Sequence, residues 1–200
     1  MSPESQIRLT AFLLLVVTFS ISGYYRRKAN LSGGEGDYDF REEQPWVRRI
    51  RVGGALLGYG SLLIYLIYPP LVAWAQLDLP LWLRWSGLGL TALMAPAIYW
   101  LFSNLGNNVT PTVSIREEHR LVTSGPYRFI RHPLYTFGYL AFTGLSLAAA
   151  NWFIFAMLTL ACTALVERTK HEEAKLLERF GAEYEAYRQR TGRYLPRVFS

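Results

Sequence analysis

Five long apolar runs constrain the fold of this 200-residue chain more than any other feature. A helix that crosses a membrane needs about 20 apolar residues, with a lower limit of about 17. The second and third runs meet that length, the first is marginal, and the last two are short. Hydrophobic residues make up 51% of the chain and charged residues only 18%, a composition typical of a membrane protein. We therefore predict an all-α integral membrane protein with about five transmembrane helices, over residues 9–24, 52–68, 81–103, 134–149 and 151–166.

Short connections and small residues indicate how some of these runs pack. Only Ala150 and Asn151 separate the last two runs, so we expect a helical hairpin that turns there. Whether this hairpin crosses the bilayer or dips partway into it, both of its ends face the same side. The second run contains Gly54-x-x-x-Gly58, a spacing that favours close contact between helices.

The basic residues predict the orientation in the membrane. Nineteen of the 21 lysines and arginines lie in residues 24–51, 103–132 and 168–200, which five crossings would place on one face. Basic loops remain on the cytoplasmic side, so we expect these segments to be cytoplasmic. The cluster Arg26-Arg27-Lys28 follows the first apolar run instead of preceding it, which predicts a retained helix rather than a cleaved signal peptide.

The chain reads as one domain over residues 1–200, with no repeat and no linker. A charged segment follows the hairpin and carries apolar residues at helical spacing, which predicts an amphipathic helix. Such a helix can lie on the membrane surface or fold back over a site. Its apolar stripe consists of Leu176, Leu177, Phe180, Tyr184 and Tyr187.

Two polar motifs lie at the ends of the hairpin. The first is Gly125-Pro-Tyr-Arg-Phe-Ile-Arg-His-Pro-Leu-Tyr135, and the second is Arg168-Thr-Lys-His-Glu-Glu173. Taken singly, His132-Pro133 is an ordinary helix start, and Glu172-Glu173 is an ordinary solvated helix face. Charged groups held against a bilayer are costly, however, so their occurrence together indicates a functional site.

These motifs resemble those of the isoprenylcysteine carboxyl methyltransferases and the related phospholipid methyltransferases. The resemblance covers about residues 100–196, half of the chain, and the catalytic half would be about residues 104–196. It implies a membrane enzyme that moves a methyl group from S-adenosyl-L-methionine to a lipophilic small molecule or a prenylcysteine. It also implies a cytoplasmic active site, with the C-terminal helix covering the cofactor pocket.

The resemblance assigns roles by position. Arg168 would lie beside the acceptor and serve as the catalytic residue. Thr112 stands where relatives place a larger amide, which leaves the acceptor open. The residues that would bind the cofactor are His119, Arg120, Leu121, Val122, Tyr127, His132, Pro133, Leu134, Tyr135 and Glu172.

The chemistry of these side chains suits that donor. The rings of Tyr127 and Tyr135 can stack on an adenine or lie near a sulfonium cation. The carboxylate of Glu172 can hold an amino group or ribose hydroxyls, and His132 can form hydrogen bonds at neutral pH without a fixed charge. Because the methyl displacement is in line, the protein mainly positions the two reactants and excludes water.

Several other functions are disfavoured by the sequence. The three histidines lack the spacing of metal ligands and no cysteine pair accompanies them, so we expect no metal site. The net charge of +6 is explained by topology, so we expect no nucleic-acid partner. No Gly-x-Gly-x-x-Gly follows a strand, which excludes the soluble methyltransferase fold.

Three alternatives stay open. An arginine at the acceptor pairs with a carboxylate or a phenolate, so Arg168 favours carboxyl or hydroxyl O-methylation of a prenylated or long-chain substrate. N-methylation of a phosphatidylethanolamine-type phospholipid is the second possibility. A membrane sterol-type reductase that uses NADPH is a different class of enzyme, although Glu172 and Glu173 would repel the extra phosphate. A non-catalytic membrane scaffold is the last alternative, beside N-methylation and the reductase.

Overall fold

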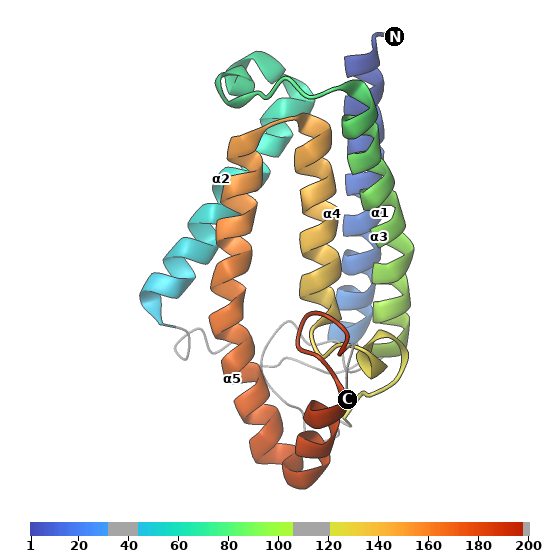
Figure 1. Cartoon of the computed structure of the whole chain (residues 1–200), viewed down its shortest axis with the longest axis vertical. Coiled ribbons are helices and arrows are strands. Elements are labelled where there is room, and N and C mark those ends of the chain that lie inside the picture. Colours follow the sequence, from blue (N-terminus) through green and yellow to red (C-terminus); the bar gives the residue numbers. More distant parts are fainter. Residues whose placement is uncertain (32–43, 106–120, 198–200) are drawn as a thin grey trace.

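The computed structural model describes residues 1–31, 44–105 and 121–197 of the chain. These residues form helices joined by short connections, with two isolated β-bridges and no strand among them. The predicted all-α class is therefore confirmed (Figure 1). The elements are α1 (Pro3–Leu31), α2 (Pro45–Ile67), η2 (Pro69–Ala75), α3 (Leu81–Leu105), η4 (Gly125–Arg128), α4 (Pro133–Ala149) and α5 (Trp152–Arg190).

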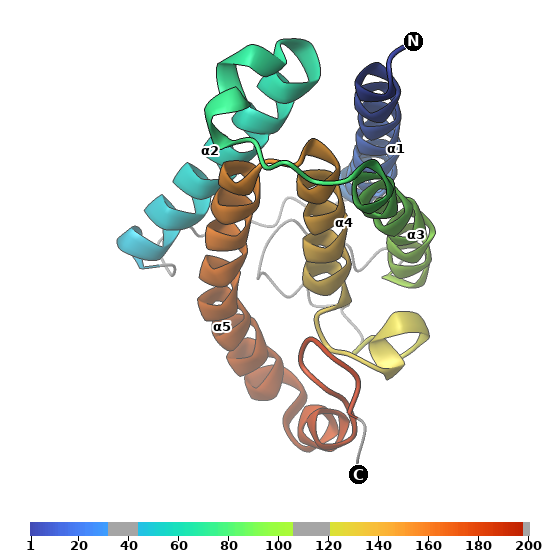
Figure 2. The same ribbon diagram turned by 45° about the horizontal axis from the view of Figure 1, so that its top comes forward.

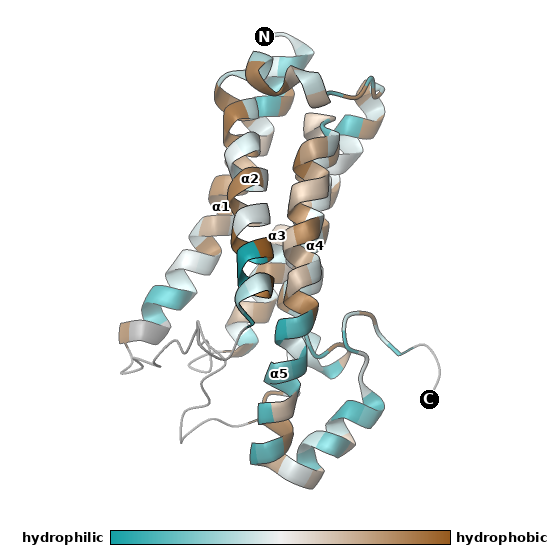
Figure 3. Ribbon diagram, turned by 90° about the vertical axis from the view of Figure 1, so that its left-hand side faces the viewer, coloured by the Kyte–Doolittle hydropathy of each residue, from teal (hydrophilic) through white to brown (hydrophobic). Residues whose placement is uncertain are grey.

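Among the described residues, four helices are long and apolar enough to cross a membrane: α1, α2, α3 and α5. The fourth apolar run of the sequence forms α4, which has 17 residues. Large apolar side chains such as Phe12, Leu56 and Leu93 are exposed on the outer surfaces of the bundle. Figure 3 shows the apolar middle of the helices and the polar lower part of α5. An outward apolar surface over this length suits lipid rather than water.

The predicted hairpin is confirmed. Helix α4 ends at Ala149, Ala150 takes a left-handed conformation with φ of 50°, and α5 begins at Trp152. Asn151 caps α5, because its side-chain oxygen accepts a hydrogen bond from the backbone N–H of Ile154 at 3.1 Å. Its amide nitrogen donates to the carbonyl of Val72 at 2.9 Å, which ties the turn to η2.

Small residues allow two pairs of helices to pack closely, α2 with α5 and α3 with α4. A Cβ atom added at Gly54 would lie 2.9 Å from the carbonyl oxygen of Met157 in α5, so the predicted packing role of this glycine is confirmed. A Cβ added at Gly87 in α3 would lie 2.5 Å from the carbonyl oxygen of Gly144 in α4. Both contacts are too short for any larger side chain without movement of the backbone.

The ends of the helices separate into two groups. The C-terminal ends of α1, α3 and α5 lie with η4 in the lower part of Figure 1, and the start of α2 lies in the same half of the molecule, apart on the left. The N-terminus, η2 and the turn between α4 and α5 lie at the upper end. The polar motifs at the start of α4 and in the lower half of α5 are therefore brought to one end of the bundle.

An ion pair between a buried arginine and a partly exposed glutamate joins helices at the opposite end. The Arg84 side chain, 9% exposed, contacts Glu4 Oε2 at 2.8 Å and donates to the hydroxyl of Tyr65 at 3.0 Å. It also donates to the carbonyl of Ala148 at 2.8 Å. Arg84 is thus held inside the protein and links α1, α2 and α3 with the end of α4.

Helix α5 is longer than the fifth apolar run and is broken once. It continues past the apolar stretch to Arg190, but Gly181 has φ of 51° and ψ of −122°, which are not helical values. After this break the chain turns back toward η4 (Figure 2). The predicted single apolar stripe is therefore wrong, because the break divides it: Tyr184 and Tyr187 are buried, whereas Leu177 is 38% exposed.

Candidate active site

The segment before α4 is shaped by a glycine and two prolines. Gly125 has φ of 58°, and a Cβ added to it would lie 2.4 Å from the side chain of Asn104 in α3. Pro126 opens the short helix η4, and Pro133 opens α4. Proline is favoured there because the first turn of a helix needs no backbone donor. His132 is the residue just before α4 and is 8% exposed.

Four of the predicted site residues meet at this end of the bundle. Glu172 Oε1 accepts hydrogen bonds from Tyr135 Oη and from Arg168 Nε, both at 2.9 Å. His132 Nδ1 lies 3.6 Å from Glu172 Oε2. The His132 and Tyr135 rings are stacked, with centroids 5.7 Å apart and planes 15° apart. The start of α4 and the middle of α5 thus present one polar and aromatic cluster.

The other predicted residues have different surroundings. The backbone carbonyl of Tyr127 accepts a hydrogen bond from the hydroxyl of Tyr187 at 2.7 Å. The Tyr127 side chain and Leu134 pack against the cluster of Ile98, Leu101 and Phe102. Burial raises the pKa of Tyr127 above its ordinary value, so its hydroxyl stays protonated.

Of the remaining predicted residues, Pro133 is fully buried. Leu121 and Val122 are half-buried, and His119 and Arg120 lie outside the described residues.

Glu173 lies at the centre of a cluster that the sequence did not predict. Its side chain is 6% exposed and contacts Arg131 Nε at 2.9 Å, His132 Nε2 at 3.2 Å and Arg193 Nη2 at 2.6 Å. Burial alone would raise the pKa of this carboxyl, but the hydrogen bonds from His132, Arg193 and Arg131 outweigh it and hold the pKa well below its usual range. Glu173 is therefore an ionised, enclosed carboxylate.

Neighbouring glutamates in a helix point about 100° apart, so only one of a Glu-Glu pair can face such a cluster. The signal in the sequence was the excess of arginines near the motifs, Arg131 before α4 and Arg193 after α5. The sequence does not say which glutamate they pair with.

The chain after α5 returns to the start of α4. The backbone N–H groups of Arg131 and His132 donate to the carbonyls of Gly192 at 2.9 Å and Arg193 at 3.0 Å. The hydroxyl of Thr136 donates to the carbonyl of Tyr194 at 2.8 Å. Residues 191–194, which we call the return loop, are thereby fixed against the residues that precede and begin α4.

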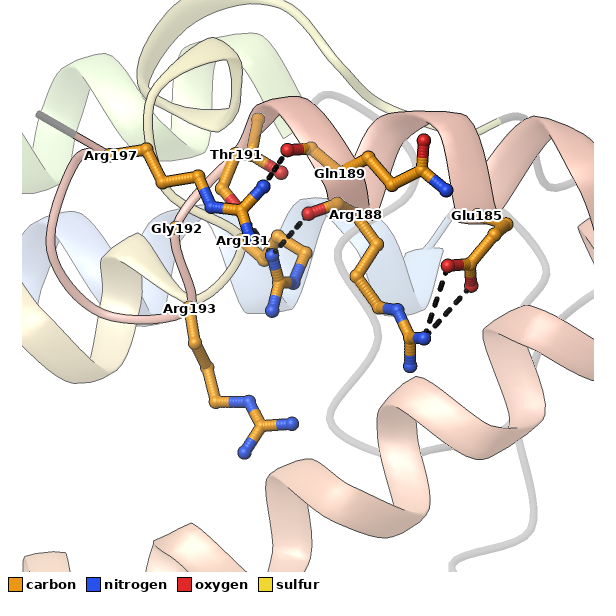
Figure 4. Close-up of a pocket in the computed structure, with 8 residues that line it drawn as sticks. All are labelled: Arg131, Glu185, Arg188, Gln189, Thr191, Gly192, Arg193 and Arg197. Atoms are coloured by element: carbon orange, nitrogen blue, oxygen red, sulfur yellow. Dashed lines mark hydrogen bonds and ion pairs between the residues drawn. The ribbon is translucent and has the colours of Figure 1, made fainter. Parts of the chain in front are cut away.

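A basic pocket of about 430 Å³ lies beside this cluster (Figure 4). It adjoins the Glu173 cluster through Arg131 and Arg193, and none of the predicted donor residues that the structure describes lines it. Its arginines are held in place: Arg188 contacts Glu185 at 3.0 Å, and Arg197 donates to the carbonyl of Gln189. The lining residues are Arg131, Glu185, Arg188, Gln189, Thr191, Gly192, Arg193 and Arg197.

Within the part of the chain that the structure describes, no group of three or more histidine, cysteine or acidic side chains is arranged to hold a metal ion. The polar cluster at the end of the bundle consists of the carboxylates, guanidinium groups, imidazole and phenol rings described above. These groups can bind a ligand that carries an amine, hydroxyls and an aromatic ring.

Comparison with known proteins places the chain in a family. It is 34% identical over 86 residues to a nickel-cobalt-cadmium resistance protein of Alcaligenes xylosoxydans xylosoxydans. It is also 34% identical over 86 residues to a cobalt-zinc-cadmium resistance protein of Cupriavidus metallidurans. Each alignment covers 43% of the chain and 40% of the relative. It is 30% identical over 130 residues to protein-S-isoprenylcysteine O-methyltransferase of Mus musculus, which covers 62% of the chain and 45% of that protein.

The matched part of the chain thus spans less than half the length of these relatives. A family model described as phospholipid methyltransferase matches residues 82–183, which include α3, α4 and the two motifs. That match covers half of the chain, and the chain belongs to the phospholipid methyltransferase family.

Proposed function

We propose that this chain is an integral membrane methyltransferase that uses S-adenosyl-L-methionine to methylate a lipophilic acceptor. The observation that carries the proposal is the meeting of His132, Tyr135, Arg168 and Glu172 at one end of an apolar helical bundle. Two of these residues come from the start of α4 and two from α5, so they converge only in the folded chain. Membership of the phospholipid methyltransferase family supports the same chemistry.

The residues present fit the donor. Glu172 is 20% exposed, so its carboxylate is within reach of a ligand. A carboxylate has about four lone-pair sites, and Tyr135 and Arg168 use two, which leaves room for an amine or a ribose hydroxyl. The stacked rings of His132 and Tyr135 offer an aromatic face for an adenine or a cation. When bound, the donor supplies an electrophilic methyl group on sulfur.

The chain's own contribution is positioning. Glu172 and the two rings would fix the donor, and Arg168 would orient the acceptor about one helical turn away on the same face of α5. An in-line displacement needs both reactants held close and water excluded, and in our proposal this end of the bundle does both. Leu121 and Val122 are part of the proposed donor site, and the resemblance also assigns to it His119 and Arg120, which lie outside the described residues.

For the acceptor, we propose carboxyl or hydroxyl O-methylation of a prenylated or long-chain molecule. A guanidinium forms planar, paired hydrogen bonds with a carboxylate and repels a cationic amine, which makes Arg168 better suited to an acid. The relative from Mus musculus is named for O-methylation of isoprenylcysteine. The family description favours the alternative, a phospholipid whose amine is methylated.

We further propose that the active end of the bundle faces the cytoplasm. The basic ends of α1 and α5 lie near the motifs, and the basic start of α2 lies in the same half of the molecule. Positively charged loops are retained on the cytoplasmic side. A lipid acceptor would then approach from the inner leaflet.

Two titrations and one assay test the proposal. The purified chain in detergent should bind S-adenosylhomocysteine and should not bind NADPH. It should then transfer a labelled methyl group from S-adenosyl-L-methionine to a farnesylated cysteine with a free carboxyl, and not to phosphatidylethanolamine. Binding of NADPH alone would indicate the reductase, and binding of neither ligand would indicate a non-catalytic protein.

A further inference from the structure

Glu173, on α5, gathers cationic and polar groups from two other segments. Arg131 and His132 precede α4, Arg193 belongs to the return loop, and all three reach the same carboxylate on α5. With only 6% of the Glu173 side chain exposed, little of this carboxylate is within reach of a ligand. Removing one member of such an enclosed ion cluster leaves the others without compensation. Glu173 thus connects the start of α4, the middle of α5 and the end of the chain.

The cluster determines the state of the His132 ring. Nε2 lies 3.2 Å from Glu173 Oε1, and an ionised carboxylate can only accept a hydrogen bond, so Nε2 carries the proton. Nδ1 is then directed toward Glu172, and the ring plane is the one that stacks on Tyr135. Which ring nitrogen holds the proton is set by the partner of the other nitrogen.

The same carboxylate holds the return loop. Arg193 contributes Nη2 at 2.6 Å and Nε at 3.2 Å, a two-pronged contact that fixes the direction of its guanidinium. Arg131, whose Nε contacts Glu173 Oε1, also donates through Nη1 to the carbonyls of Arg188 and Thr191. The last turn of α5 and the return loop therefore depend on Glu173 through both arginines.

We propose that Glu173 is a positioning residue: it does not contact either reactant, and it fixes His132 with Nε2 protonated while it clamps the return loop against the start of α4. The inference rests on the proposed function in one respect, since His132, Tyr135 and Glu172 are taken there as donor-binding groups. Glu172 and Glu173 then have separate tasks although they are adjacent in sequence.

The direct test is the state of the His132 ring. The chain has three histidines, and ¹⁵N labelling of histidine with a His132→Gln reference assigns the signal. In the wild type the Nε2 signal should be that of a protonated nitrogen. In Glu173→Gln it should move toward a mixture of tautomers. The control is Glu178→Gln, an exposed glutamate on the same helix, which should leave the signal unchanged.

Kinetics give the second readout. Glu173→Gln should raise the KM for the methyl donor by about tenfold, the effect of one weakened hydrogen bond to a charged group, and change the KM for the acceptor by less than about twofold. Arg193→Gln removes one arm of the cluster and should act in the same direction but less strongly. If Glu173→Gln does not fold, this variant carries the test.

The outcomes separate the proposals. An unchanged His132 signal in Glu173→Gln would overturn the positioning role. If Glu173→Gln does not fold, an unchanged signal in Arg193→Gln would do the same. A changed signal with an unchanged KM for the methyl donor would also overturn it. Absence of any S-adenosylhomocysteine binding by the wild type would overturn the proposed function, whereas the histidine spectrum needs no donor and still decides whether Glu173 positions His132.

Discussion

Two adjacent glutamates in α5 occupy different environments. Glu172 is 20% exposed and is shared by Arg168 and Tyr135, whereas Glu173 is 6% exposed and is enclosed by Arg131, His132 and Arg193. The difference follows from helix geometry, which turns successive side chains by about 100°. A partly exposed carboxylate can take a ligand, and an enclosed one with all its partners in the protein holds the structure around it.

At the scale of single residues, Glu172→Gln should weaken the binding of S-adenosylhomocysteine. The amide keeps the size of the side chain but removes the charge, and a hydrogen bond to a charged group contributes about 1.5–3 kcal/mol. Isothermal titration of the purified variant measures the change, with Glu167→Gln, an exposed glutamate of the same helix, as the control. Unchanged affinity in a folded variant would remove Glu172 from the donor site.

Arg168→Ala should abolish methyl transfer without weakening donor binding. Arg168 Nε donates to Glu172 at 2.9 Å, so its loss leaves the carboxylate with one cationic neighbour fewer and does not remove a donor contact. Arg168→Lys should also be inactive, because an ammonium group cannot reproduce planar paired hydrogen bonds. Transfer to a farnesylated cysteine and S-adenosylhomocysteine affinity are the two measurements. Full activity of Arg168→Ala would contradict both the acceptor role and the preference for O-methylation.

At the scale of elements, the bundle is built from two closely packed helix pairs and one broken helix. Glycines in α2 and α3 let those helices approach α5 and α4, and Gly181 lets the last part of α5 turn back toward η4. The turn places Tyr187 where its hydroxyl reaches the carbonyl of Tyr127. The site therefore depends on how the helices approach one another as well as on the motif residues.

Gly87→Ala should lower the thermal stability of the protein in detergent, by an amount corresponding to about 1–3 kcal/mol. The added methyl would lie 2.5 Å from the carbonyl oxygen of Gly144, and a backbone atom cannot move aside cheaply. Gly89→Ala is the matched control, since a Cβ there meets nothing within 4 Å on the same helix. It should be neutral or slightly stabilising, because alanine is the better helix former. Equal melting temperatures for the two variants would disprove the close contact.

At the scale of the whole molecule, the bundle is polarised. The site end carries the basic ends of α1, α2 and α5, and the opposite end carries the ion pair of Arg84 with Glu4. The buried guanidinium of Arg84 is tolerated because it is paired with Glu4, and with Tyr65 the pair connects three helices. The two ends thus have different tasks, one in anchoring the bundle and one in the proposed chemistry.

This polarity predicts which residues are accessible from each side of the membrane. With Cys162 replaced by Ala, a cysteine at Ser124 or Gln189, both exposed at the site end, should react with an impermeant reagent only after the membrane is opened. A cysteine at Ser2, exposed at the opposite end, should react in intact cells. Labelling of Ser124→Cys from outside would contradict the proposed cytoplasmic site.

Much of the architecture could be predicted from the sequence, because it depends on local or one-dimensional properties. The apolar runs predicted the helices, since a backbone in lipid must satisfy its hydrogen bonds internally and helices do so. Ala150 and Asn151 marked the turn of the hairpin, and Gly54 marked a close packing position. The spaced motifs around His132 and Glu172 indicated the site and the family.

The tertiary structure alone decided the features that depend on distant partners. Periodicity could not reveal that Glu173, rather than Glu172, would be enclosed, because its partners come from residues 131 and 193, on either side of α5 in the sequence. The break at Gly181 and the burial of Arg84 could not be predicted from the sequence, because they also depend on distant partners. A glycine breaks a helix only when contacts such as Tyr187 with Tyr127 stabilise the turn, and an arginine becomes internal only when another helix supplies its carboxylate.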